Sequence, residues 1–219
     1  MFQESMFIFR VLSRQPVRMK LHDSLPQLVR SPIVQAQNST KGLSQYQSIF
    51  MQVADEHKCV NAFELQELLD VCLPNGKTDG RATVFGLVSC NILTAISDYI
   101  KSCASLEVCR LIIATFDSKG FGKVNFKEFK DLICSIKFWQ SAFKTHTKEK
   151  TGILKAERLR EALLDVGFQL NSSVMGSIVS KYIRKDGTLR FGDFVGAILN
   201  LSIAFSESLA KNELDNQAN

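Results

Sequence analysis

The sequence predicts an all-α fold of about four helix-loop-helix units that follow a short N-terminal β segment and a linker. Apolar residues recur at helical spacing from Leu43 onward, and glycine-centred polar turns separate these helical stretches. The turns also repeat, because Gly122, Gly152 and Gly187 lie 30 and 35 residues apart. With 219 residues, of which 45% are hydrophobic, the chain is long enough to bury one sizeable core.

Residues 1–42 are expected to lie outside the repeat. Residues 6–12 are rich in strand-forming types and predict one β-strand, and three of the four prolines follow them, which predicts a linker. This segment holds six Lys or Arg against Glu4 and Asp23, so it carries most of the net charge of +5. Its basic residues are spread out and lack interleaved aromatics, so we expect a solvated or partner-facing segment and no nucleic-acid binding.

The repeat domain is expected to cover residues 43–205. Helical periodicity predicts two short amphipathic helices up to about residue 73, and a glycine-containing loop with a helix near 83–101 would form an insertion near 74–104. The remaining helices are expected at 106–116, 126–146, 156–166, 172–183 and from Phe191 onward. Residues 206–219 would form a polar tail.

The repeating turns have the spacing of an EF-hand, a helix-loop-helix unit that can bind calcium. Its 12-residue loop has ligands at positions 1, 3, 5, 7, 9 and 12 and a sharp turn at position 6. Each turn glycine here is followed two residues later by an apolar residue at position 8, where neighbouring loops would join as a strand pair. These apolar residues, with their equivalent in an earlier copy, are Val124, Leu154, Leu189 and Val60.

Loop 2, residues 117–128, has the best frame for a calcium site. Its candidate ligands are Asp117, the carbonyl of Lys123, Asn125 and Glu128. Positions 3 and 5 are Lys119 and Phe121, which offer no side-chain oxygen, so the set falls short of the six to eight oxygens that calcium takes. Three lysines against two carboxylates also leave the loop with a net charge of +1, which disfavours a divalent cation.

The other loops also depart from a complete calcium site. Loop 1, residues 54–64, is acidic but would need backbone carbonyls to complete a site. Loop 3, residues 147–158, has Arg158 at position 12, where a carboxylate belongs. Loop 4, residues 182–193, has Tyr182 and Arg184 at positions 1 and 3. We therefore expect loops 2 to 4 to be structural, and loop 1 is the candidate for weak calcium binding.

Two runs of sequence resemble the second hand and the following helix of the penta-EF-hand domain of calpains. They are residues 116–132 and 136–140, and the second contains the aromatic pair Phe138 and Trp139. The likeness continues at 166–171 and 191–194 and covers about 43–73 and 105–205. Residues 7–12 are similar to the last β-sandwich strand before the calcium domain of calpain large chains, so the resemblance favours the C-terminal piece of a large chain, without the protease core, over a small subunit.

The resemblance also implies ligands and contacts. In that family the first hand begins its ligand set on the carbonyl that matches Ala54 and ends it on the carboxylate that matches Glu64, with His57 standing here in place of an acidic ligand. The family pairs its subunits through a fifth hand. No loop glycine follows Phe205, so we do not expect this pairing, and we expect an uncovered apolar face that would promote self-association. This face would comprise Ile198, Leu201, Ile203 and Phe205.

We expect a binding module and not an enzyme. A papain-like centre needs a cysteine thiolate activated by a histidine, and none of the three histidines has such a context. Six cysteines without a C-x-x-C pair favour a cytoplasmic protein, and the apolar start is too short for a transmembrane segment.

Two interpretations remain. One is a regulatory domain of a calpain-type protease with weak or no calcium binding, and the other is a calcium-independent interaction scaffold. A calpain-type catalytic or small subunit, or a homologous EF-hand chain, would be the protein partner.

Overall fold

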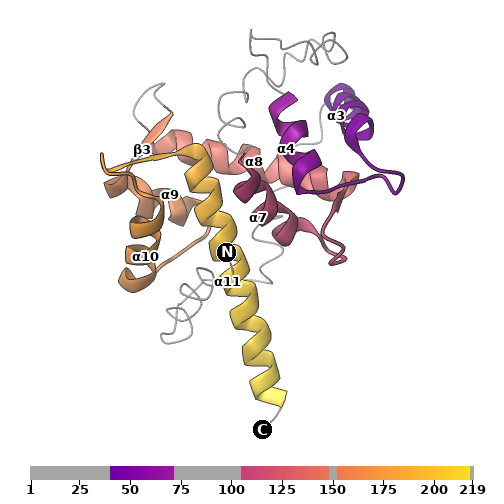
Figure 1. Cartoon of the computed structure of the whole chain (residues 1–219). Helices are drawn as coiled ribbons and strands as arrows, with labels where there is room; N and C mark the ends of the chain where they lie inside the picture. Colours follow the sequence, from indigo (N-terminus) through magenta and orange to yellow (C-terminus); the bar gives the residue numbers. More distant parts are fainter. Residues whose placement is uncertain (1–39, 72–104, 148–151, 218–219) are drawn as a thin grey trace. The chain divides into compact units, whose positions relative to one another are not determined.

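The computed structural model describes residues 40–71, 105–147 and 152–217 (Figure 1). The strand expected at 6–12, the linker and the insertion near 74–104 lie outside the described residues. The described residues are mostly helical with short strands, which confirms the all-α, EF-hand type of fold. They fall into two compact units. The first unit ends at Lys137 and the second begins at Phe138, so the boundary between them lies within the long helix Phe126–His146.

The first unit contains loops 1 and 2. Val60 pairs with Val124 and Cys59 with Asn125 in an antiparallel strand pair, so position 8 joins neighbouring loops as the sequence predicted. Both valines are fully buried. Phe50 packs against Phe126 and Phe129, with ring centroids 5.4 and 5.1 Å apart. The elements are α3 (Thr40–Val53), β1 (Cys59–Val60), α4 (Ala62–Val71), α7 (Leu106–Phe116), β2 (Val124–Asn125) and the first part of α8 (Phe126–His146).

The second unit repeats this plan with loops 3 and 4. Leu154 pairs with Leu189, and both are fully buried. Phe143 on α8 packs against Phe191 and Phe194, each with its ring centroid 5.3 Å away. The elements after α8 are β3 (Ile153–Lys155), the 3-10 turn η2 (Ala156–Arg158), α9 (Leu159–Asp165), α10 (Ser172–Tyr182), β4 (Thr188–Arg190) and α11 (Phe191–Gln217). Helix α11 therefore continues through most of the segment 206–219.

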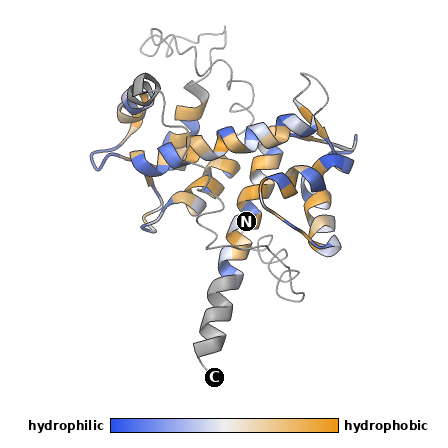
Figure 2. Ribbon diagram, turned by 180° about the vertical axis from the view of Figure 1, so that it is seen from behind, coloured by the Kyte–Doolittle hydropathy of each residue, from blue (hydrophilic) through white to orange (hydrophobic). Residues whose placement is uncertain are grey.

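Hydrophobic residues gather on the helix sides that face other helices of the same unit, whereas loop 1 is hydrophilic (Figure 2). Trp139 on α8 is only 1% exposed and belongs to this core. No helix of the described segments has both the length and the apolar run that a membrane span requires.

The expectation of an uncovered apolar face on α11 is wrong for most of its residues. Ile198 and Leu201 are fully buried, Ile203 is half-buried, and Phe205 is 7% exposed. Phe168, which follows α9, stacks on Phe205 with ring centroids 6.0 Å apart. The predicted self-association therefore loses its physical basis, since the chain itself covers these side chains.

Candidate functional site

Positions 9 and 12 of loop 2 start helix α8. The side-chain oxygen of Asn125 accepts hydrogen bonds from the backbone N–H groups of Lys127, at 2.9 Å, and Glu128, at 3.1 Å. Glu128 Oε2 in turn accepts the N–H of Asn125 at 2.9 Å. This reciprocal pair is a capping box, which satisfies N–H groups that would lack partners in the first turn of a helix. Two candidate calcium ligands therefore have a structural role without metal.

Asp117, at position 1, holds the turn of loop 2. Its Oδ1 accepts the N–H groups of Lys119 and Gly120 at 3.0 and 2.9 Å, and its Oδ2 accepts the N–H of Gly122 at 2.6 Å. Both glycines have φ of 73°, a left-handed conformation that residues with a Cβ rarely adopt. The carboxylate thus fixes the backbone of the turn.

The other oxygen of Glu128 is also occupied. Glu128 Oε1 accepts the backbone N–H and the hydroxyl of Ser118, at 3.1 and 2.5 Å. The residue is only 6% exposed. A bidentate calcium ligand at position 12 offers both oxygens to the ion. Here both oxygens already accept hydrogen bonds from the chain, so bidentate binding would have to break or weaken them.

Lys123 connects loop 2 to loop 1. Its ammonium lies 2.6 Å from Asp55 Oδ2, while Asp55 Oδ1 accepts the N–H groups of His57 and Cys59, each at 2.9 Å. The Lys123 hydrogen bond, as the largest cause, lowers the pKa of Asp55 below its ordinary value, and Asp55 raises the pKa of Lys123. A lysine of one loop thereby neutralises a carboxylate of its neighbour.

This ion pair predicts a pH dependence. Because the pKa of Asp55 is lowered in the folded chain, the pair stabilises the fold above about pH 4 and its contribution is lost as the pH falls further. We expect Asp55→Asn to lower the midpoint of thermal unfolding at neutral pH and to approach wild type in acid. Glu56→Gln, at an exposed carboxylate of the same loop, serves as the control. An Asp55→Asn difference that stays constant down to pH 2 would contradict the assignment.

Loop 1 repeats the helix cap of loop 2. Asn61 accepts the N–H groups of Phe63 and Glu64, and Glu64 Oε2 accepts the N–H of Asn61 at 2.7 Å. Ala54, the other candidate calcium ligand of this loop, donates its N–H to the carbonyl of Phe50 in the last turn of α3. Lys58 stands where the other loops have a glycine and has φ of 58°, a conformation that is costly for a residue with a Cβ.

Loop 4 holds its carboxylates with its own side chains. The guanidinium of Arg184, at position 3, lies 3.3 Å from Asp193 Oδ2 at position 12. The Tyr182 hydroxyl, at position 1, donates to the carbonyl of Gly196 at 3.1 Å and accepts from the side-chain amide of Asn200. Both contacts lie on α11, so position 1 serves helix packing.

Loop 3 is described only in part, because residues 148–151 lie outside the described residues. Arg158, at its position 12, is exposed and pairs with Glu161 at 2.6 Å. The basic group therefore faces solvent and the adjoining helix α9.

The side chains do not fit a calcium ion as they stand. Sequence reasoning placed Asn125 and Glu128 correctly at one helix start, but it missed Ser118 as the donor to Glu128 and Asp55 as the partner of Lys123. The strand pairing of Val60 with Val124 could have signalled the second contact, since it brings the two loops together. Within residues 40–71, 105–147 and 152–217, no three His, Cys, Asp or Glu side chains are grouped to hold a metal ion.

Comparisons with known proteins relate the chain to calpains. Calpain-C of Drosophila melanogaster is 39% identical over an alignment of 219 positions, which covers 96% of this chain and 29% of that protein. Human calpain small subunit 2 is 39% identical over 101 residues, 46% of this chain and 41% of that one. Mouse calpain small subunit 1 is 29% identical over 180 residues, 80% of this chain and 59% of that one.

The chain thus spans less than two thirds of each of these relatives. No family model matches it. Neighbouring loops of the helix-loop-helix units are joined by antiparallel strand pairs, and the chain is similar to a calpain along nearly its whole length. These findings identify a calpain-related penta-EF-hand domain.

Proposed function

We propose that this chain is a non-catalytic interaction and regulatory domain of calpain type, with weak or no response to calcium. One observation carries the proposal: in each of loops 1, 2 and 4, a carboxylate is held by a donor or cation of the chain itself. Asp55 is held by Lys123, Glu128 by Ser118, and Asp193 by Arg184. Loops built in this way keep their shape without metal.

A ligand can shift a conformational equilibrium only by the difference between its affinities for the two states. Calcium would have to compete with the hydrogen bonds of Glu128, and positions 3 and 5 of loop 2 would give it no side-chain oxygen in return. The net positive charge of that loop adds a further cost. Calcium therefore has little to gain from rearranging the loop, and the domain would work as a scaffold.

The relatives support a protein partner, since two of them are named as calpain subunits. We propose that this chain docks on a calpain-type catalytic chain, a small subunit or a homologous EF-hand chain in the cytoplasm. The alternative is a scaffold with a partner outside this family, favoured by the same internally held loops.

The experiment measures the affinity of the purified chain for a recombinant calpain-type catalytic chain and for a small subunit. Titrations are run in millimolar calcium and in a chelator. We expect binding to at least one partner, with affinities that agree within about twofold between the two conditions. Binding only in calcium would overturn the proposed calcium independence, whereas failure to bind either chain would overturn the calpain-type partner and favour the alternative.

A further inference from the structure

Phe121 stands out at the tip of loop 2. Its side chain is 76% exposed, the highest value among the large hydrophobic residues that the structure describes. Gly120 and Gly122 flank it, and a Cβ atom added at either glycine would meet nothing within 4 Å. The tip therefore stands clear of the rest of the chain. Phe121 occupies position 5, where an EF-hand places an oxygen ligand, so the metal function of the loop does not explain it.

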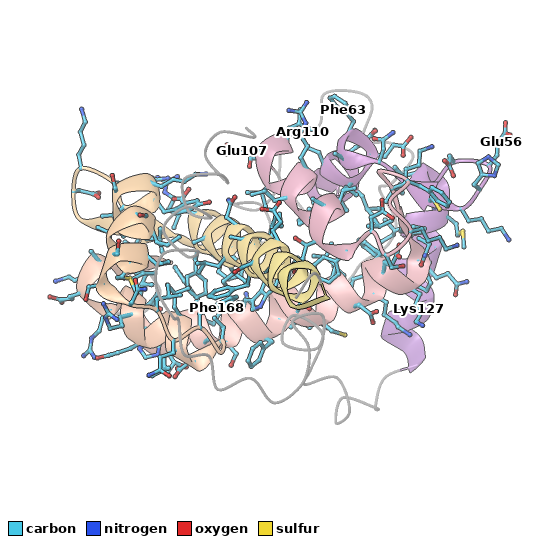
Figure 3. All side chains as sticks on the ribbon, turned by 90° about the horizontal axis from the view of Figure 1, so that it is seen from below. Glu56, Phe63, Glu107, Arg110, Lys127 and Phe168 are labelled. Carbon is cyan, nitrogen blue, oxygen red and sulfur yellow. The ribbon has the colours of Figure 1, made fainter. Side chains whose placement is uncertain are left out.

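The exposed charged side chains of loop 2 are lysines. Lys119 and Lys127 are both exposed, and Lys127 lies apart from the acidic tip of loop 1 at Glu56 (Figure 3). The carboxylates of loop 2 have partners within the chain, because half-buried Asp117 accepts three backbone N–H groups and Glu128 is buried. Loop 2 thus carries one exposed aromatic ring at its tip and two exposed lysines.

The geometry favours a lipid surface over a folded protein as the binding partner. A specific protein interface buries about 800 Å² on each side, more than one protruding loop tip supplies. The interface of a bilayer needs no matching surface: it takes aromatic rings at the level of the headgroups, and its anionic lipids attract lysines. A single ring with two lysines would give weak and reversible binding.

We propose that the tip of loop 2 binds anionic lipid surfaces, with Phe121 inserted at the headgroup level and Lys119 and Lys127 on the acidic headgroups. The interaction needs no calcium, because the lysines supply the charge that a bridging ion would otherwise provide. It is independent of the calpain-type partner proposed above. The basic N-terminal segment could add a nonspecific attraction, so the test has to isolate the contribution of the tip.

The test is sedimentation of the full chain with vesicles of phosphatidylcholine, with and without phosphatidylserine, in the presence of a chelator. We expect binding to the anionic vesicles. Phe121→Ala should weaken it about tenfold, and the Lys119→Gln/Lys127→Gln variant should weaken it about twentyfold. Phe63→Ala is the matched control, since Phe63 is 64% exposed but lies on α4 near Arg110 (Figure 3), and it should bind as wild type.

Insertion is measured with Phe121→Trp and brominated lipids. The new indole should be quenched, whereas Trp139, which is 1% exposed, provides an unquenched background in the wild-type chain. Equal binding of wild type and Phe121→Ala, or an unquenched Phe121→Trp, would overturn the proposal. So would tip variants that bind vesicles normally but lose binding to a poly-glutamate peptide, a result that would assign the tip to acidic proteins instead.

Discussion

Calcium affinity in the micromolar range is expected when Lys119→Asp and Phe121→Asn are introduced together. These changes supply the missing oxygens at positions 3 and 5 and complete the spacing of an EF-hand loop around Asp117, Asn125 and Glu128. They also change the loop from net positive to net negative. Sensor loops of this composition bind calcium at about 0.1 to 10 µM, so the gain over the wild-type chain should be large.

Calorimetric titration measures this gain. Trp139 lies on α8, the helix that leaves loop 2, and its fluorescence provides a second signal. Adding Glu128→Gln to the double variant is the control, because it removes the bidentate carboxylate and should abolish the new site. A double variant that still fails to bind below millimolar calcium would show that the absent oxygens are not what silences the loop.

Phe143→Ala is expected to lower the free energy of unfolding of the second unit by about 3 to 5 kcal/mol. Phe143 is fully buried and packs on Phe191 and Phe194, so truncation leaves a cavity between α8 and α11. This loss is a large fraction of the roughly 5 to 15 kcal/mol that stabilise a typical domain.

Denaturant unfolding followed by Trp139 fluorescence measures the loss. Leu164→Ala is the control, because Leu164 is 55% exposed on α9 and should change the free energy of unfolding by about 0.5 kcal/mol or less. Equal unfolding midpoints for Phe143→Ala and wild type would contradict the packing described above.

The frame of the domain could be predicted because it depends on local and periodic signals. Position 8 of each loop is apolar, and the structure pairs Val60 with Val124 and Leu154 with Leu189. The starts of the helices at Ala62 and Phe126 follow from the Asn-x-x-Glu pattern of the capping boxes, which a sequence displays directly.

The charge pairs within and between the loops could not be predicted in the same way. Asp55 and Lys123 are 68 residues apart, and only the strand pairing brings their loops together. The sequence likewise shows no cover for Phe205, because Phe168 lies on a separate connection and reaches it only in the fold. Counting charges loop by loop indicated a poor calcium site, but it missed the specific side chains that hold loops 1, 2 and 4.

The chain therefore keeps the framework of an EF-hand pair, and its own side chains hold the loops in place. In loop 2 the carboxylates that would bind an ion order the turn and cap α8, and in the first loop pair an ammonium group connects the two loops. Removing the ammonium with Lys123→Met would leave Asp55 without its cationic partner, and the resulting variant provides a second test of the same idea.

The most direct test is a calorimetric titration of the purified wild-type chain with calcium, with Trp139 fluorescence recorded in parallel. Loops held by Lys123, Ser118 and Arg184 predict no saturable heat below millimolar calcium and an unchanged spectrum. Saturable micromolar binding accompanied by a change in Trp139 emission would contradict this account and identify the chain as a calcium sensor.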